Sequence, residues 1–266
     1  MQRKNRIHPL KYLGQNYLID HNIIKKIVDE LNPVHDDQII EIGPGKGSIT
    51  KELINRLERL IVVEIDKRVI EDLKKISGKI IILHEDILNI DFNSFAGNGD
   101  RKFRVIGNIP FNLTAPIIFK LIRSRTVVGD AVFLVQNEVA KRIAAPKSTK
   151  DYGILSVLLK YFGESKYCFK VSPNVFYPKP KVETAVIHIS FNKKTSSDIS
   201  DELFINTVKA AFGNRRKTLK NSLGNSIFKN SNFGSFDFDL SKRAEELDVE
   251  DFVKLAVFIK SQTNDK

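Results

Sequence analysis

The sequence lacks the features that mark secreted and membrane-spanning proteins. Only one of its 266 residues, Cys168, is a cysteine, so no internal disulfide can form, which fits a reducing compartment. No apolar run approaches the ~18 residues that would cross a bilayer, and the basic start MQRKNRIHPLKYLG has no apolar core to act as a secretory signal. We therefore expect a cytoplasmic protein without a membrane-spanning segment.

Residues that bind metals or act as nucleophiles are also scarce. Cys168 lies in the strand-like stretch KYCFKV, with no histidine or glycine-rich loop beside it, so a catalytic thiol is not expected. The histidines are scattered without the short spacings of metal ligands, and we predict no metal site. They are His8, His21, His35, His84 and His188.

Acidic residues are outnumbered, because 43 lysines and arginines face 32 aspartates and glutamates, for a net charge of +11. Such a positive field favours polyanionic partners. Nucleic acid is the first candidate. An anionic membrane is the weaker one, since no long amphipathic basic helix is apparent. A basic surface that merely keeps the protein soluble is the alternative.

The first two-thirds of the chain alternate between strand-like and helix-like segments. Segment 21–31 repeats its apolar residues at helical spacing, and Asp20 precedes it as an N-cap. Continuous apolar strands alternating with helices predict an α/β, Rossmann-like fold, with helices on both faces of a parallel sheet. The expected strands are 38–43, 59–66, 79–88, 103–110 and 130–136, with an edge pair at 165–171 and 184–191. Segments 79–88 and 103–110 each include a loop after the strand. The expected helices are 21–31, 48–57, 68–76, 115–124 and 138–145.

The character of the sequence changes after Phe191. A polar, turn-like stretch follows, and helical patterns predominate beyond it, with Asp248 as a candidate cap of the last one. The expected helices here include 203–212, 215–223 and 249–260. We predict a Rossmann-like domain over 1–192, a linker over 193–197 and a small all-helical domain over 198–266.

A glycine-rich loop, EIGPGKG, follows the first strand of the predicted sheet. Its glycines, Gly43 and Gly45 among them, permit positive φ and let a ligand approach the backbone. Glu64 ends the next strand, where a carboxylate can accept both hydroxyls of a ribose. A P-loop is excluded by its missing pattern, and a dinucleotide site is left open although the spacing is G-x-G-x-G. Glu41 and Pro44 resemble the S-adenosylmethionine site of Rossmann-like methyltransferases.

Asp86 ends the third strand, where its carboxylate can accept the amino group of an adenine. Ile65 and Ile87 would then sandwich the adenine ring. Taken alone, Asp86 fits a helix cap equally well. In a doubly wound sheet the loops after the strands open at one edge, so we expect these residues to meet the glycine loop and Asn108.

The stretch NIPFN follows the fourth strand. The Asn108 side-chain oxygen and the Ile109 carbonyl oxygen can each accept a proton of an aromatic amine. That aims the nitrogen lone pair at a methyl group and stabilises the developing positive charge. Pro110 fixes the backbone, and Phe111 offers a face for a flipped-out base. No cysteine lies nearby for ring-carbon methylation, so an exocyclic amine, adenine's above all, is the expected target. A stiff loop with a core phenylalanine is the simpler interpretation.

Nearly the whole chain resembles the ribosomal RNA adenine dimethyltransferases, and most closely their small-subunit branch. The resemblance is carried by LGQNYL, EIGPGKG, VVEID, HEDIL and NIPFN, and further along by QNEVAKRI, YGILSVL, VFYPKPKVETAV and AAFGNRRKTLKNSL. It implies that Phe176 packs on the flipped adenine. It also implies a set of residues at the cofactor S-adenosylmethionine, namely Asn16, Leu18, Gly43, Gly45, Glu64, Ile65, Asp86, Ile87 and Asn108.

By this resemblance the protein dimethylates two adjacent adenosines near the 3′ end of 16S rRNA, within a pre-assembled 30S ribosomal subunit. Two alternatives are a resistance-type enzyme that acts on large-subunit rRNA and an assembly factor that has lost catalysis. Phe111 stands where most bacterial members carry Tyr, and Tyr17 where Phe is usual. Either ring can stack, so we expect activity to persist. Monomer is the default expectation.

A basic cluster in the predicted helical domain is the candidate for phosphate contacts. If it binds RNA, removing its charges should weaken binding and flatten the salt dependence. A solvated helix face is the alternative. Its members are Arg215, Arg216, Lys217 and Lys220.

Overall fold

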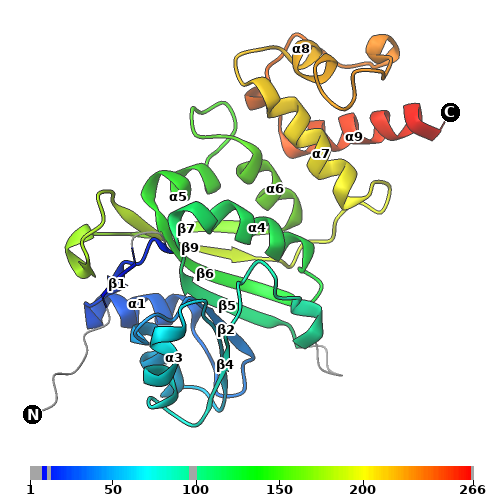
Figure 1. The fold of residues 1–266 in the computed structure, drawn as a ribbon. Coiled ribbons are helices and arrows are strands. Elements are labelled where there is room, and N and C mark those ends of the chain that lie inside the picture. Colours follow the sequence, from blue (N-terminus) through cyan, green and yellow to red (C-terminus); the bar gives the residue numbers. More distant parts are fainter. Residues whose placement is uncertain (1–7, 11–12, 96–100, 265–266) are drawn as a thin grey trace, which may run out of the picture. The chain divides into compact units, whose positions relative to one another are not determined.

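The computed structural model describes residues 8–10, 13–95 and 101–264 (Figure 1). The chain divides into a sheet unit, residues 1–140 and 166–191, and a helical unit, residues 141–165 and 192–266. The predicted linker lies just inside the second stretch of the helical unit. The inclusion of 141–165 in that unit was not predicted.

The sheet unit holds a seven-stranded sheet with the order β4-β3-β2-β5-β6-β9-β7. Figure 1 shows β2, β5 and β6 side by side within it. The strands expected from the sequence form, and the expected pair lies at one edge, with β7 outermost. A short ladder joins β1 to β8. The bounds are β1 Tyr17–Leu18, β2 Ile39–Ile42, β3 Leu60–Val63, β4 Ile80–Leu83, β5 Phe103–Asn108, β6 Val128–Gln136, β7 Glu164–Val171, β8 Phe176–Tyr177 and β9 Thr184–Ser190.

The sheet is mixed rather than parallel throughout. β2 pairs in parallel with β3 and β5, β3 with β4, and β5 with β6. β9 pairs antiparallel with β6, so the expectation of an all-parallel sheet is wrong there. Between β7 and β9, which are neighbours in the sheet, lie only a single helical turn and the short β8, too short a connection for the helical crossover that a parallel pair usually needs.

The helices agree with the expected ones, with two exceptions. α6 was not predicted, and α8 begins only at Leu219, four residues later than expected. Asp20 caps α1 by accepting a hydrogen bond from the Ile23 N–H (3.0 Å), and Asp248 caps α9 by accepting one from Asp251 (3.0 Å), both as predicted. The bounds are α1 His21–Leu31, α2 Ser48–Ile54, α3 Lys67–Lys74, α4 Thr114–Arg123, α5 Asn137–Ile143, α6 Ile154–Phe162, α7 Asp201–Ala211, α8 Leu219–Gly224 and α9 Val249–Asn264.

The core of the sheet unit forms where apolar helix faces meet the apolar strands. α1 buries Ile24, Ile27, Val28 and Leu31, which join one cluster with residues of β2, β3, β5, β6 and β9. Each fully buried side chain of this kind contributes roughly 1.5–3 kcal/mol. This packing fixes where the strands end, and the strand ends carry the site.

Aromatic packing joins residues 141–165 to the later helices of the helical unit. Tyr161 of α6 stacks on Phe204 of α7 with ring centroids 3.7 Å apart, and the Tyr152 hydroxyl donates to the Leu247 carbonyl (3.0 Å). α7 and α9 lie side by side (Figure 1). Among the helices of the described residues, none combines the length and the apolar character needed to cross a membrane.

An ion-pair network ties β5 to β6 and β9 in the sheet unit. Arg104 donates to both carboxylate oxygens of Asp130 (2.7 and 2.8 Å), and the His188 Nε2 lies 2.8 Å from one of them. The side chains of Arg104 and Asp130 are 22% and 14% exposed. Burial alone would raise the pKa of Asp130, but the hydrogen bonds from Arg104 and His188 outweigh it and hold this pKa below its ordinary 3.8.

We predict that Asp130→Asn destabilises the protein by about 2–4 kcal/mol at pH 7, because Arg104 loses a half-buried carboxylate partner and is left with Asp37 as an ion-pair partner. The folded-state pKa of Asp130 is the lower one, so its contribution is present above pH ~4 and is lost as the pH falls further. The deficit should therefore shrink in acid. Urea unfolding at pH 7 and near pH 3.5 measures both values.

Asp36→Asn is the matched control, because Asp36 pairs with Arg101 on the exposed surface. Its effect should be far smaller at pH 7. Equal deficits for the two variants would contradict a stabilising role of the buried network.

Candidate functional site

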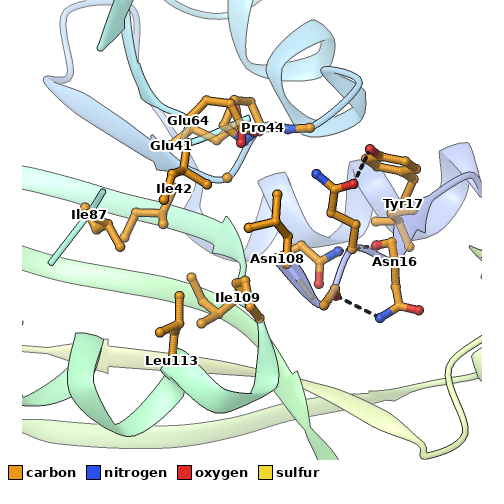
Figure 2. A pocket seen from close by; sticks show the side chains of 18 of the residues that line it. Asn16, Tyr17, Glu41, Ile42, Pro44, Glu64, Ile87, Asn108, Ile109 and Leu113 are labelled. Atoms are coloured by element: carbon orange, nitrogen blue, oxygen red, sulfur yellow. Dashed lines mark hydrogen bonds between the residues drawn. The ribbon is translucent and has the colours of Figure 1, made fainter. Parts of the chain in front are cut away.

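A pocket of about 270 Å³ opens at the carboxyl ends of β2, β3 and β5. β2 leads through α2 to β3 on one side and pairs with β5 on the other, and doubly wound sheets bind ligands at such a switch point. All of the predicted cofactor and target-base residues line this pocket, some of them drawn in Figure 2. They are Asn16, Leu18, Gly43, Gly45, Glu64, Ile65, Asp86, Ile87, Asn108, Ile109, Pro110, Phe111 and Phe176.

The glycine loop between β2 and α2 needs its glycines for two reasons. Gly43, Gly45 and Gly47 have φ of 64°, 54° and 76°, a region that side chains disfavour. A Cβ added at Gly45 would lie 2.8 Å from Cε1 of Tyr17, too close for a real contact. The ring of Tyr17 therefore packs directly on the backbone of Gly45 and leaves no room for a side chain there.

Glu64 is buried and holds the loop from the end of β3. Its two carboxylate oxygens accept hydrogen bonds from the backbone N–H of Gly45 and of Asp66, each at 2.9 Å. Burial is the main cause that raises its pKa, and the two N–H groups work in the opposite direction. The carboxylate oxygens keep further lone pairs, which can accept hydrogen bonds from the two hydroxyls of a ribose.

Glu41, in β2, is a second buried carboxyl next to the loop. It is 1% exposed and accepts a hydrogen bond from the Thr50 hydroxyl at 2.7 Å. Burial raises the pKa of Glu41 to about 8, and the nearby Glu64 adds to this rise. Figure 2 shows the two glutamates together beside Pro44. The sequence suggested Glu41 only as a resemblance, because a buried acid cannot be distinguished from an exposed one by pattern.

The predicted adenine residues lie together, with different exposures. Ile65 is 49% exposed and Ile87 is 5% exposed, and both line the pocket with Asp86. Asp86 accepts a hydrogen bond from the Leu88 N–H at 2.9 Å and so closes a local turn. The structure describes this stretch and no helix begins there, so the alternative interpretation of Asp86 as a helix cap is wrong. An aspartate has oxygens enough for both the turn and an adenine amino group.

Asn108, the last residue of β5, lines the pocket, and a backbone carbonyl holds its amide. Its Nδ2 donates to the Asn16 carbonyl at 2.7 Å, which fixes the orientation of the amide. The Ile109 N–H donates to the Leu134 carbonyl of β6 at 3.1 Å, and the Leu113 N–H donates to the Pro110 carbonyl at 2.9 Å. With the donor side of the amide engaged, the Asn108 Oδ1 remains as an acceptor.

Two aromatic rings from distant parts of the chain border the same pocket. Phe111 begins a single 3-10 turn, Phe111–Leu113, and is half-buried. Phe176 of β8 is 4% exposed and lies opposite Leu18 of β1 in the short ladder. The ladder therefore links a predicted cofactor residue to a predicted base-stacking residue.

Sequence reasoning missed Gln15 and Tyr17, which line the pocket, and Asp66, which holds Gln15 from outside it. The Gln15 Nε2 donates to Asp66 at 2.8 Å, and the Tyr17 hydroxyl donates to the Gln15 Oε1 at 2.9 Å. Asp66 is buried, and its hydrogen bond to Arg68 is the main cause that lowers its pKa to about 2. A link over 51 residues has no sequence spacing to reveal it, and Tyr17 in place of the usual Phe is the one local signal.

The basic cluster lies in the helical unit, in the turn before α8 and at its start. Arg215 is engaged within that unit, with Glu245 at 3.3 Å and the carbonyls of Lys150 and Tyr152 as acceptors. Arg216, Lys217 and Lys220 are exposed. The alternative interpretation, in which all four residues lie on one solvated helix face, is wrong for Arg215, Arg216 and Lys217, because α8 starts only at Leu219.

Cys168 lies in β7, where its thiol is half-buried. Burial raises the pKa of the Cys168 thiol to about 12, which keeps it protonated. In the described ranges no three His, Cys, Asp or Glu side chains gather in a way that could hold a metal ion.

We predict that Glu41→Gln stabilises the cofactor-free protein increasingly as the pH rises from 5 to 8. The folded-state pKa is the higher one, so the unfolded state ionises first above pH ~4.5 and the parent loses stability towards pH 8. Glutamine keeps the Thr50 hydrogen bond without that cost, and the gain at pH 8 should exceed about 1 kcal/mol. Thermal or urea unfolding across this range is the measurement.

Exposed Glu58 supplies the control variant Glu58→Gln, which should show no such trend. A parallel pH dependence of the parent and Glu41→Gln would contradict the raised pKa.

Comparison with known proteins supports one family. The family model described as ribosomal RNA adenine dimethylase matches residues 8–261. Proteins named ribosomal RNA small subunit methyltransferase A are similar to this chain. The one from Chlorobium phaeobacteroides is 42% identical over 92% of this chain and 89% of its own length. The one from Legionella pneumophila (strain Corby) is 39% identical over 94% and 98%, respectively.

Solved structures agree with the fold. A dimethyladenosine transferase from Plasmodium falciparum has a TM-score of 0.75 at 23% identity and covers 92% of this chain and 98% of its own. The 23S rRNA methyltransferase ErmE has a TM-score of 0.66 at 23% identity, with 92% and 100% covered. With the family match over almost the full length, this chain belongs to the ribosomal RNA adenine dimethylases, which are S-adenosylmethionine-dependent methyltransferases.

Proposed function

We propose that this enzyme dimethylates two adjacent adenosines near the 3′ end of small-subunit rRNA, acting as a monomer on a pre-assembled 30S subunit in the cytoplasm. The observation that supports the chemistry is the Asn108 amide, which lines the pocket and donates its Nδ2 to the Asn16 carbonyl, so that its Oδ1 would serve as the acceptor. The small-subunit substrate rests on relatives of 38–42% identity, which bear the small-subunit name.

The residues present fit S-adenosylmethionine. The Glu64 carboxylate would accept the ribose hydroxyls, Asp86 the adenine amino group, and Ile65 and Ile87 would cover the ring. The bare backbone at Gly43, where an added Cβ would meet only the Asn108 carbonyl at 4.0 Å, leaves room for a ligand. When bound, this cofactor supplies a methyl group on a positively charged sulfur.

The chemistry asked of Asn108 and Ile109 is alignment rather than proton removal before attack. The lone pair of an adenine amine is delocalised into the ring. Two acceptors on its protons, the Asn108 Oδ1 and the Ile109 carbonyl oxygen, would draw the nitrogen towards tetrahedral geometry. They would also stabilise the charge that develops as the nitrogen–carbon bond forms and the carbon–sulfur bond breaks. The proton then leaves the product amine.

Phe111 and Phe176 are proposed to stack on the flipped adenine, which is worth roughly 1–3 kcal/mol per stacked base. Phe176 is supported by its place opposite Leu18, which holds it at the pocket. Phe111 lacks the hydroxyl that tyrosine would bring, and stacking does not require it.

We predict dimethyladenosine when the enzyme, labelled S-adenosylmethionine and undermethylated small subunits are combined, and none with large-subunit RNA. Asn108→Ala should lower the turnover about 100-fold or more, since a transition-state acceptor is lost, while cofactor affinity stays within a few-fold. Mass analysis of the digested nucleosides, with calorimetry of cofactor binding, measures both.

Product from large-subunit RNA alone would assign the enzyme to the resistance type instead. No product from either RNA, with no cofactor binding, would indicate a non-catalytic assembly factor. Near-normal turnover of Asn108→Ala would show that the Ile109 carbonyl suffices and would remove Asn108 from the catalytic residues.

The basic cluster is proposed to bind rRNA phosphates. Replacing Arg216, Lys217 and Lys220 by alanine should weaken RNA binding and reduce the salt slope by about 2–3, or close to one unit for each lost contact. Arg215 is better left in place, because its bonds to Glu245 and to two carbonyls hold the helical unit together. Filter binding across a salt series gives the slope.

A triple alanine variant of three exposed lysines, Lys67 and Lys74 of α3 and Lys75 directly after it, is charge-matched and serves as the control. If both triple variants change the slope equally, the cluster has no special role and only the net charge matters.

A further inference from the structure

Gln15 occupies the centre of a hydrogen-bond network that the proposed function does not use. Its Oε1 accepts from the Leu10 N–H at 2.8 Å and from the Tyr17 hydroxyl at 2.9 Å, and its Nε2 donates to the Asp66 Oδ2 at 2.8 Å. Gln15 thus has partners on both sides of its amide. It belongs to the segment 13–18, which we call the strap.

Asp66 connects Gln15 to Glu64 through two hydrogen bonds, one at its side chain and one at its backbone. Its side chain also accepts three hydrogen bonds from Arg68, and it is 4% exposed. Its own backbone N–H donates to the Glu64 Oε1 at 2.9 Å. The residue that Gln15 holds therefore supplies one of the two N–H groups that orient the Glu64 carboxylate. The other comes from Gly45.

The strap also touches the opposite half of the pocket. The Asn16 carbonyl accepts from Asn108, the Ser48 hydroxyl donates to the Leu18 carbonyl at 2.7 Å, and the ring of Tyr17 covers Gly45. A shift of the strap would therefore be felt at the proposed ribose acid and at the proposed catalytic amide. Gln15 is its side-chain link to the ribose side.

We propose that Gln15 is a positioning residue that, through Asp66, holds the Glu64 carboxylate in place for the cofactor ribose. This rests on the proposed use of Glu64. The Tyr17 hydroxyl completes the arrangement by fixing which side of the Gln15 amide faces Asp66. Gln15 acts on cofactor affinity and leaves the chemical step at saturating cofactor nearly unchanged.

The charges around Gln15 make a sharp test available. Asp66, Arg68 and Glu64 are its neighbours from the β3–α3 side, and the Lys46 Nζ lies 4.8 Å from the Tyr17 ring centroid. Gln15→Glu replaces the donor by a carboxylate facing Asp66. The two carboxylates repel when both are ionised, and they can share a proton in mild acid.

We expect Gln15→Leu to raise the Kd for S-adenosylmethionine about tenfold, as for a lost hydrogen bond to a charged group, with kcat within about threefold of the parent. Gln15→Glu should raise the Kd at least tenfold at pH 8 and by clearly less at pH 6. Tyr17→Phe should raise it by about two- to threefold. Calorimetry at both pH values and steady-state kinetics with small subunits measure these quantities.

Gln38→Glu makes the same chemical change at an exposed position beside the start of β2, and it should leave the Kd unchanged. A simple loss of folding would lower the binding-competent fraction of Gln15→Glu without recovery at pH 6. An unaltered Kd for Gln15→Leu, or a loss in Gln15→Glu that is equal at both pH values, would overturn the proposal. So would a Glu64→Gln variant that binds the cofactor as the parent does.

Failure of the proposed function would appear elsewhere, as a parent enzyme that methylates no small subunits. A parent that is active while the Gln15 variants bind the cofactor normally would overturn the positioning role alone.

Discussion

The two backbone hydrogen bonds that Glu64 accepts hold the site together, because they join the loop after β2 to the loop after β3. Parallel neighbouring strands bring their carboxyl ends to one edge, but they do not fix the loops that follow. A buried carboxylate with two N–H donors does so, at the cost of removing a charged group from water. These bonds fix the backbone of Gly45, the Glu64 carboxylate and the backbone of Asp66, just before α3, relative to one another. The other pocket residues are arranged around this group.

Much of this arrangement could be predicted from the sequence. The glycine loop, Glu64, Asp86 and NIPFN each follow an apolar strand, and their convergence follows from strand order alone. Each of these residues lies within a few positions of the strand that positions it, so a short stretch of sequence is enough to predict its place. The caps at Asp20 and Asp248 were predictable for the same reason, since a cap acts on the next turn of its own helix.

The features that escaped prediction depend on contacts between distant residues. The strap reaches Asp66 and Asn108 across 51 and 92 positions, and no periodicity records such a link. β9 runs antiparallel to β6, and the apolar pattern of a strand does not show its direction. Within the helical unit α6 packs on α7, where Tyr161 stacks on Phe204, 43 positions further along the chain. The spacing of apolar residues shows that a helix or strand has an apolar face, but it does not show which other element packs against that face.

The chain passes between its two units three times, at 140–141, 165–166 and 191–192. On a ribosome that makes this protein, residues 141–165 emerge well before the segment that completes their unit. The stacking of Tyr161 of α6 on Phe204 cannot form until Phe204 is synthesised. The helical unit cannot finish folding from its own continuous segment, so its assembly must wait for the last quarter of the chain, after most of the sheet unit has already left the ribosome.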